Sequence, residues 1–247
     1  MNEVIRQLHE RKSVRAFTDQ TIDAAVKKEI LYAACAAPTA GNQQMYTILD
    51  ITDRELIQKL SVTCDNQPFI ADAQLVLIFC ADFKKWYDLF LSQGCVPRKP
   101  AMGDFMLAVQ DAVIAAQNAV TAAHSFGLGS CYIGDIMENC EQHREMLQLP
   151  QYVFPAAMVV FGYPTQQQIE REKPKRCDLS YVVHENAYHT MKSDTLCEMF
   201  DYKKGVLPFD EWCTRFCERK YNSDFSVEMS RSVSLYMKDY LTEENAQ

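Results

Sequence analysis

Glycine is scarce in this chain, at 8 of 247 residues, and the glycine-rich loops that bind nucleotides are absent. Neither a G-x-G-x-x-G opening nor a G-x-x-x-x-G-K loop occurs, which argues against Rossmann-type and P-loop phosphate binding. The nucleophile elbow G-x-S-x-G and the zinc motif H-E-x-x-H are missing too. No acid–base pair stands out, so no catalytic side chain is assigned. If the chain is an enzyme, a cofactor is expected to perform the difficult step.

Long apolar segments and paired cysteines are also lacking. The N-terminus carries no signal-peptide hydrophobic region, and the most apolar runs, 75–81 and 156–161, are too short to span a bilayer. We therefore expect a cytoplasmic protein with no membrane partner, whose ten cysteines are mostly free thiols. No C-x-x-C pair occurs, and Cys213 and Cys217 lack further ligands nearby, so no metal site is expected.

What the chain does have is positive charge gathered at two places. The whole sequence is acidic, with 25 Lys+Arg against 33 Asp+Glu and a net charge of −8, yet basic residues cluster at 11–15 and 171–176. A nucleic-acid-binding protein would more often show a broad basic face and a high pI, so no nucleic-acid partner is expected. The clusters indicate a local anion site.

Hydrophobic periodicity predicts an α+β domain. Helical spacing predicts helices over residues 3–10, 21–37, 53–64, 105–126, 210–219 and 226–240, and apolar runs predict strands over 47–51, 75–81 and 156–161. We expect Asp104 to cap the long helix and Gly127 to end it. Alanine on several faces of that helix places it at the centre of the fold or of a dimer. Strands that alternate with more numerous helices predict one domain with a small central sheet.

The first basic cluster is arranged to bind an anion if its backbone is extended. Arg11, Ser13 and Arg15 alternate, so an extended segment points all three side chains the same way, which suits a phosphate with an adjacent polar group. The alternative is a solvated basic turn at the end of a helix, where cations also favour the helix dipole. For the second cluster an exposed loop is the default interpretation, and nothing local connects the two clusters. The glycine-rich segment 127–134 is either a strand that a flat ligand approaches closely or a helix end followed by a turn.

Six segments, in this order and spacing, resemble the FMN-dependent nitroreductase family. They are residues 11–17, 37–44, 127–134, 162–164, 173–176 and 183–188, and the likeness runs from about residue 1 to 190. Residues 80–83 after Gln67 are similar to the larger, NADPH-preferring branch. The resemblance implies an α+β, three-layer fold with a small, mostly antiparallel central sheet flanked by helices. It also implies an intertwined homodimer with FMN at the subunit interface.

The resemblance also assigns a set of FMN-binding residues. The phosphate would meet Arg11, Lys12, Ser13, Lys173 and either Lys175 or Arg176, while Arg15 would face the ribityl chain and the pyrimidine edge, and Gln67 the pyrimidine. Pro38, Thr39, Ala40 and Asn42 would come from the partner chain, and Tyr132, Ile133, Gly134 and Asp135 would line the flavin ring. Asp135 departs from the family, where glycine is frequent, and a carboxylate there opposes a negative reduced flavin unless it turns away. Residues 1–190 would form the FMN-binding domain, and 191–247 a helical extension that packs on the domain or on the partner subunit.

By resemblance the chain is an oxidoreductase that uses NADPH or NADH to reduce nitroaromatics, quinones or similar electron-poor small molecules in a ping-pong reaction. A reductive dehalogenase, an enone reductase or a flavin-fragmenting enzyme of the same fold is one alternative, and it would need a lid. Residues 86–100 are the segment that could provide this lid, unless they only connect two elements. A non-catalytic, FMN-binding redox sensor is the other alternative.

Overall fold

A computed structural model describes residues 1–241 of the chain, which divides into two compact units. The first unit comprises Met1–Arg171 and the chain from Glu228 onward, and the second comprises Glu172–Val227. The predicted boundary between residues 190 and 191 falls inside the second unit. That division of the chain stays a prediction, and the last six positions of the predicted extension lie outside the described residues.

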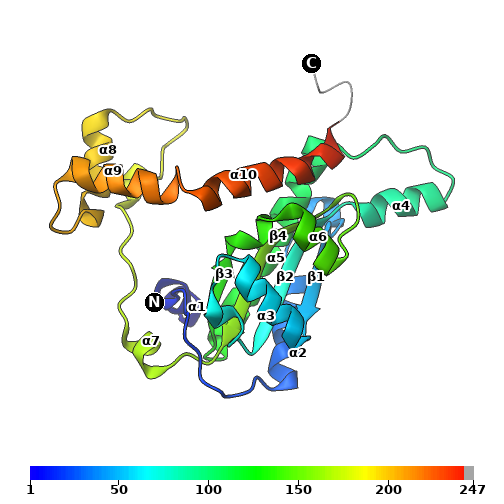
Figure 1. The fold of residues 1–247 in the computed structure, drawn as a ribbon, viewed down its shortest axis with the longest axis horizontal. Helices are drawn as coiled ribbons and strands as arrows, with labels where there is room; N and C mark the ends of the chain where they lie inside the picture. Colours follow the sequence, from blue (N-terminus) through cyan, green and yellow to red (C-terminus); the bar gives the residue numbers. More distant parts are fainter. Residues whose placement is uncertain (242–247) are drawn as a thin grey trace. The chain divides into compact units, whose positions relative to one another are not determined.

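The first unit is built on a four-stranded antiparallel sheet with the strand order β1-β2-β4-β3 (Figure 1). The strands are β1 (Tyr46–Ile51), β2 (Leu75–Asp82), β3 (Gly129–Ile133) and β4 (Val153–Gly162). Every residue of β2 and β4 is buried, which is why both read as unbroken apolar runs without alternation. The predicted α+β class with a small antiparallel sheet is confirmed.

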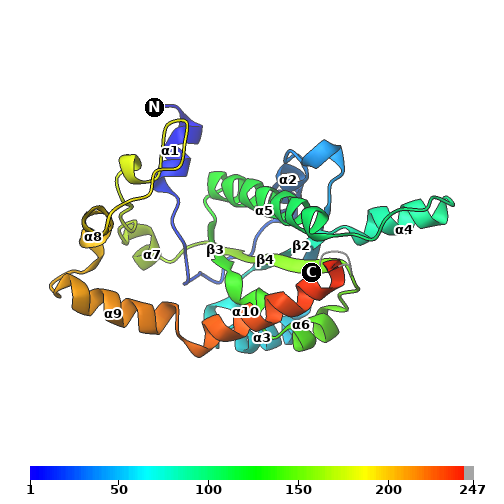
Figure 2. The same cartoon turned by 90° about the horizontal axis from the view of Figure 1, so that it is seen from above.

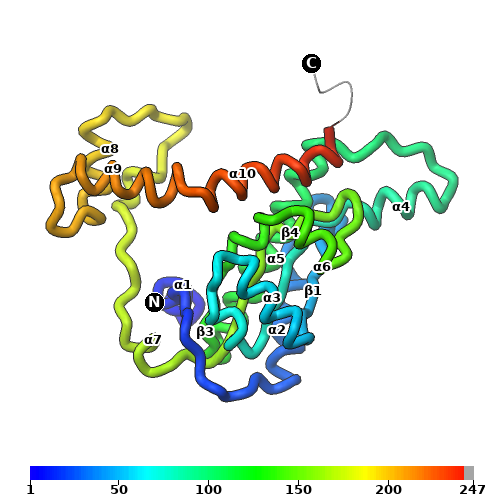
Figure 3. Tube along the Cα trace, viewed as in Figure 1, coloured from blue at the N-terminus to red at the C-terminus, as the bar shows by residue number. Residues whose placement is uncertain are grey.

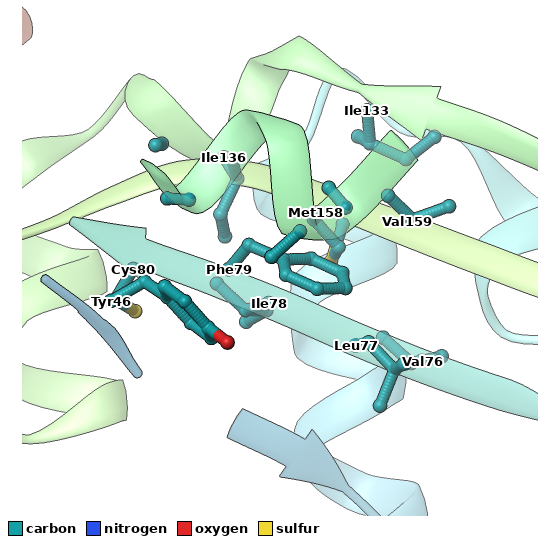
Figure 4. Close-up of a cluster of buried hydrophobic side chains, with 14 of the residues drawn as sticks. Tyr46, Val76, Leu77, Ile78, Phe79, Cys80, Ile133, Ile136, Met158 and Val159 are labelled. Carbon is teal, nitrogen blue, oxygen red and sulfur yellow. The ribbon is translucent and has the colours of Figure 1, made fainter. Parts of the chain in front are cut away.

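Helices cover both faces of the sheet (Figure 2). On one face lie α2 (Ala24–Cys35) and α5 (Met102–Ser125), and on the other lie α3 (Arg54–Thr63), α6 (Cys140–Leu147) and the part of α10 (Asp224–Met237) that belongs to the first unit. This is the three-layer arrangement that the resemblance implied. Side chains of the middle layer, among them Phe79, Ile78 and Met158, fill the space between sheet and helices (Figure 4). Burial of each large apolar side chain contributes about 1.5–3 kcal/mol, so the sheet forms a stable platform for the segments at its edges.

The alanine-rich helix α5 lies at the centre of the first unit, as predicted. Six of its alanines are fully buried, and their small side chains let α2 and the sheet approach the helix closely. The predicted cap was wrong by one turn: the helix begins at Met102, and Asp104 stands inside its first turn. The Asp104 carboxylate reaches back to accept a hydrogen bond from the backbone N–H of Ala101 (2.8 Å). Among the described residues, α5 is also the one helix long and apolar enough to cross a membrane, a test that a buried core helix passes equally well.

Several shorter elements complete the chain. The remaining helices are α1 (Glu3–Glu10), α4 (Lys84–Ser92), α7 (Gln166–Glu170), α8 (Ser193–Phe200) and α9 (Phe209–Lys220). Single 3₁₀ turns occur at Ala40–Asn42, Pro68–Ile70, Gly134–Met137, Leu179–Tyr181, Asp201–Lys203 and Lys238–Tyr240. Helix α4 covers residues 86–92 of the segment 86–100 that the sequence left as a lid or a connection, and α6 and α8 were not predicted. All ten cysteines are free thiols, as expected.

Candidate functional site

The chain between α1 and α2 runs along the edge of the sheet, beside β3 (Figure 3). The backbone N–H of Val14 donates to the carbonyl of Ser130 (2.9 Å), and Ser13 pairs with Ser130 as a parallel bridge. A Cβ atom on Gly129 would lie 2.6 Å from the Val14 side chain, so glycine is needed for this close approach. Within the glycine-rich segment 127–134, Gly127 therefore forms the turn after α5, residues 129–133 form the strand, and Gly129 admits a neighbouring chain segment.

A second glycine extends the same contact to β4. The backbone N–H of Thr18 donates to the carbonyl of Tyr163 (2.8 Å), and a Cβ on Gly162 would lie 2.7 Å from the ring of Phe17. The N-terminal segment is thus held along both β3 and the end of β4. The segments 127–134 and 162–164, more than 100 residues along the chain from the first basic cluster, are therefore its direct neighbours in space.

Polar and cationic groups of this segment act on side chains of the strand. Burial raises the pKa of the Cys131 thiol, and Arg15, Ser13 and Arg11 act against the rise. Burial likewise raises the pKa of Tyr132 to about 12, against the opposing charge of Arg11. Cys131 therefore lies near two guanidinium groups and a hydroxyl, and Tyr132 lies near Arg11.

One guanidinium N–H donor of this segment has no hydrogen-bond acceptor. The Nη1 atom of Arg11 is buried and has no hydrogen-bond partner in the protein. A buried donor without an acceptor costs about 1–3 kcal/mol, and more when it is charged. An anionic ligand group such as the FMN phosphate would supply the missing acceptor, so the donor set at this corner fits FMN.

The two basic clusters meet at Lys12 and Arg171. The Lys12 ammonium donates to the carbonyls of Ile169 (2.7 Å) and Arg171, while the Arg171 guanidinium donates to the carbonyl of Ser13. Lys12 thus holds the C-terminal end of α7, and two of its three N–H donors are used there. The assignment of Lys12 to the FMN phosphate stays a prediction, and one N–H of its ammonium remains for that contact.

The two residues assigned to the flavin ring and its pyrimidine contact each other. Gln67 Nε2 donates to the Asp135 carboxylate (3.1 Å) and to the carbonyl of Cys64 (2.8 Å). Both N–H donors of the amide are used, so its oxygen is the group that can accept a hydrogen bond from a ligand. The Asp135 carboxylate is therefore directed at Gln67.

Behind Asp135 lies a carboxyl group that the sequence reasoning missed. Glu138 is only 4% exposed, and its Oε1 atom has no hydrogen-bond partner. Burial, followed by the negative charges of Asp135, Asp65 and Glu228, raises the pKa of Glu138 to about 7. No motif marks this residue, because Asp65 and Glu228 come to it from distant parts of the chain.

The loop that carries Pro38, Thr39, Ala40 and Asn42 lies between α2 and β1, and all four residues are exposed or half-buried. Its backbone is bound to Asp111 of α5, a second residue that sequence reasoning missed. A buried aspartate in an alanine-rich helix is the sequence signal that could have identified it.

Lys175 and Arg176 lie in the second unit, on a cavity of about 600 Å³. The cavity is lined by Pro174, Lys175, Arg176, Tyr202, Lys203, Trp212, Phe216 and Arg219. Lys203 and Arg219 stand over the Phe216 ring, 5.6 Å and 5.4 Å from its centroid. Four cations beside three aromatic rings suit a ligand that is both aromatic and anionic.

Within residues 1–241 no group of three or more His, Cys, Asp or Glu side chains could hold a metal ion.

Comparison with known proteins gives a consistent result. The family model described as the nitroreductase family matches residues 8–163. The chain is 32% identical to an FMN reductase (NADPH) of Bacillus subtilis, over 98% of both chains, and 32% identical to an oxygen-insensitive NADPH nitroreductase of Salmonella typhimurium, over 79% of both. The structure of NfrA1 from Bacillus megaterium superimposes with a TM-score of 0.83 at 27% identity, covering 95% of this chain and 98% of the other.

Proposed function

The chain belongs to the nitroreductase family and is an NAD(P)H-dependent FMN oxidoreductase, and we propose that it reduces nitroaromatics, quinones or similar electron-poor acceptors by a ping-pong mechanism. The observation that carries the proposal is the anion-binding corner beside β3, where the buried Nη1 of Arg11 lacks a partner. Bound FMN supplies the two-electron redox chemistry.

The protein's contribution is binding and orientation. We propose that Arg11, Ser13 and Arg15 bind the phosphate and ribityl end, since charge-assisted donors hold a phosphate well. The amide oxygen of Gln67 would accept from the pyrimidine, and the backbone of Tyr132–Asp135 would lie along the ring. A cation close to the pyrimidine favours the negative reduced form, which is the task we assign to Arg15.

The second subunit is part of this proposal. Family members are generally dimeric, and we propose a homodimer in which the loop residues Pro38, Thr39, Ala40 and Asn42 complete the partner's FMN site. A site shared by two chains makes the dimer obligate, and such interfaces bury roughly 2,000–5,000 Å².

Among the relatives, the Bacillus and Salmonella proteins bear reductase names, which supports a soluble enzyme, and the cytoplasm stays the predicted location.

The cationic cavity of the second unit supports an anionic nucleotide. We propose that Lys175, Arg176, Lys203 and Arg219 bind a phosphate there. The resemblance implied that Lys175 or Arg176 meets the FMN phosphate, and a phosphate of the reductant is the alternative. Both ligands join an aromatic base or ring to phosphate, so the chemistry is shared. Lys173 stays assigned to the FMN phosphate as a prediction.

Anaerobic reduction followed by steady-state kinetics tests the proposal. The purified protein should be yellow, and NADPH or NADH should bleach it without oxygen. A nitroaromatic or quinone should then restore the colour. Initial rates at several fixed acceptor concentrations should give parallel double-reciprocal lines, because one pocket admits the reductant and the acceptor in turn. Intersecting lines reject the ping-pong scheme, and a yellow protein that neither nucleotide bleaches supports the redox-sensor alternative.

A further inference from the structure

Asp111 on α5 is 2% exposed, and within residues 1–241 its carboxylate forms no ion pair and accepts two backbone N–H groups instead. Its Oδ1 accepts the backbone N–H of Ala40 (2.9 Å), and its Oδ2 accepts the backbone N–H of Met45 (3.1 Å). The two hydrogen bonds hold the loop before β1 at Ala40 and at Met45. A buried carboxylate costs several kcal/mol of desolvation unless hydrogen bonds satisfy its oxygens, and here the loop supplies them.

The loop needs such an anchor because its backbone is unfavourable by itself. Gly41, Asn42 and Gln44 have φ values of 57°, 56° and 51°, so three of four consecutive residues are left-handed, and two of them are not glycine. Each non-glycine residue in this region costs of order 1 kcal/mol and persists only when its surroundings impose it. Besides the bonds to Asp111, the side chain of Trp86 on α4 donates to the carbonyl of Gln43 (2.7 Å).

The anchor leaves side chains of the loop available to a ligand. Asp111 accepts the N–H groups of Ala40 and Met45, and Thr39 Oγ1 accepts the N–H of Gln44 (3.2 Å) within the loop, while the side chain of Asn42 stays exposed. Asn42 is among the residues assigned to FMN. An unanchored loop would have to be ordered at the moment of binding, and the ordering cost would be subtracted from the affinity.

We infer that Asp111 is a positioning residue for the flavin: its carboxylate fixes the loop over residues 39–45 in the form that binds FMN. This inference rests on the proposed function. Asp111 touches neither substrate nor reacting atoms in this role and acts through the backbone of the loop. The helix that forms the centre of the fold thereby also prepares the binding site.

Asp111→Asn tests the inference, with Asp104→Asn as the matched control. The asparagine keeps one acceptor oxygen and turns an NH₂ group toward an N–H donor. Asp104 lies on the same helix, is buried to a similar degree and also accepts a backbone N–H, that of Ala101, away from the loop. FMN affinity is measured by flavin fluorescence titration of the apoproteins, and stability by thermal unfolding of the same samples.

We expect Asp111→Asn to weaken FMN binding at least about tenfold, which corresponds to 1.4 kcal/mol, while Asp104→Asn changes the affinity less than about twofold at a comparable loss of stability. Equal affinity in Asp111→Asn and wild type overturns the inference, as does equal weakening in both variants. If wild type itself binds no FMN, the proposed function fails.

Hydrogen–deuterium exchange of the wild-type apoprotein provides a test that does not need a folded variant. The amides of Ala40 and Met45 should be protected before FMN is added. Exchange at the rate of an open loop, with protection that appears only after FMN binds, contradicts a loop that Asp111 holds in advance.

Discussion

Gln67 and Asp135 lie 68 positions apart in the sequence and are joined by a 3.1 Å hydrogen bond from the amide to the carboxylate. The bond orients the amide oxygen of Gln67 and turns the charge of Asp135 to one side of the segment assigned to the flavin. A variant that removes the charge of Asp135 but keeps the hydrogen bond to Gln67 therefore separates the effect of the charge from the effect of the contact.

Asp135→Asn should raise the two-electron reduction potential of the bound FMN by about 30 mV, because a negative charge beside the ring disfavours the negative reduced flavin. The potential is measured by spectroelectrochemical titration. Asp178→Asn, which alters an exposed carboxylate of the second unit, is the control and should leave the potential unchanged. A lower potential in Asp135→Asn would contradict the proposed position of the carboxylate.

Arg11→Ala should weaken FMN binding about 10- to 100-fold, since a hydrogen bond to a charged group contributes about 1.5–3 kcal/mol. Fluorescence titration of the apoprotein measures the change. Arg6→Ala removes another arginine, one that pairs with Glu3 and Glu10 on the exposed face of α1, and should leave the affinity unchanged. Similar affinities in both variants would remove the main support for the phosphate corner.

Gly129→Ala should displace the N-terminal segment, because the added Cβ would lie 2.6 Å from Val14. We expect a loss of stability of about 1–3 kcal/mol from the overpacked contact, and weaker FMN binding in the folded fraction. Gly103→Ala is the control, since a Cβ at Gly103 meets no atom within 4 Å. Urea unfolding and FMN titration measure both effects, and a fully stable Gly129→Ala variant would show that the segment can move away from β3 at no cost.

Glu138→Gln should change how stability depends on pH. The folded pKa of Glu138, about 7, lies above the ordinary value of 4.5, so the folded state binds the proton more tightly and wild type loses stability as pH rises from about 4.5 to about 7. Above pH 7 the loss is complete. The glutamine variant lacks this loss, so relative to wild type it should gain stability between pH 4.5 and pH 8, by at most about 3 kcal/mol.

Urea unfolding of the apoproteins at both pH values measures this difference. Glu145→Gln on α6 alters an exposed carboxylate and is the control. A constant difference between Glu138→Gln and wild type across the pH range would show that Glu138 ionises normally in the folded protein.

Arg219→Ala should distinguish the two phosphates proposed for the cavity of the second unit. If the cavity binds the reductant, the KM for NADPH rises about tenfold or more and FMN affinity is unchanged; if it binds the FMN phosphate, FMN affinity falls. Arg215→Ala on the same helix removes an arginine that pairs with Glu211 and does not line the cavity, so it should change neither value. No change in either quantity for Arg219→Ala would exclude the cavity from both roles.

The central elements could be predicted because their signals are local. Strands β2 and β4 are continuous apolar runs, and α1, α2 and α3 begin one residue after Asn2, Asp23 and Asp53, whose side chains accept backbone N–H groups. The start of α5 was misplaced because aspartate is a frequent N-cap residue, whereas Asp104 lies in the first turn and accepts a hydrogen bond from the backbone N–H of Ala101. Helix α4 was missed because its aromatic residues gave no clean period, and they pack on the core by tertiary contacts.

Glu138 and the sharing of Lys12 between two carbonyls could not be predicted from the sequence, since their partners include groups tens of residues away. Asp111 left a signal, an aspartate in an alanine-rich helix, but its partners Ala40 and Met45 lie 71 and 66 positions away. The alternation of Arg11, Ser13 and Arg15 predicts that the three side chains point the same way if the backbone is extended, and that common orientation stays a prediction.

The sequence by itself determined the buried strands and the main helices, because periodicity, capping and apolar runs act over a few residues. Its motifs, in their order and spacing, also carried the resemblance that gave the family and the three-layer fold. Only the tertiary structure decided that Arg11 keeps a buried donor without a partner, that Asp135 turns to Gln67 and that Asp111 holds the loop before β1. The reason is physical: hydrogen-bond satisfaction and burial are set by groups that folding brings together from distant parts of the chain, and no local pattern encodes them.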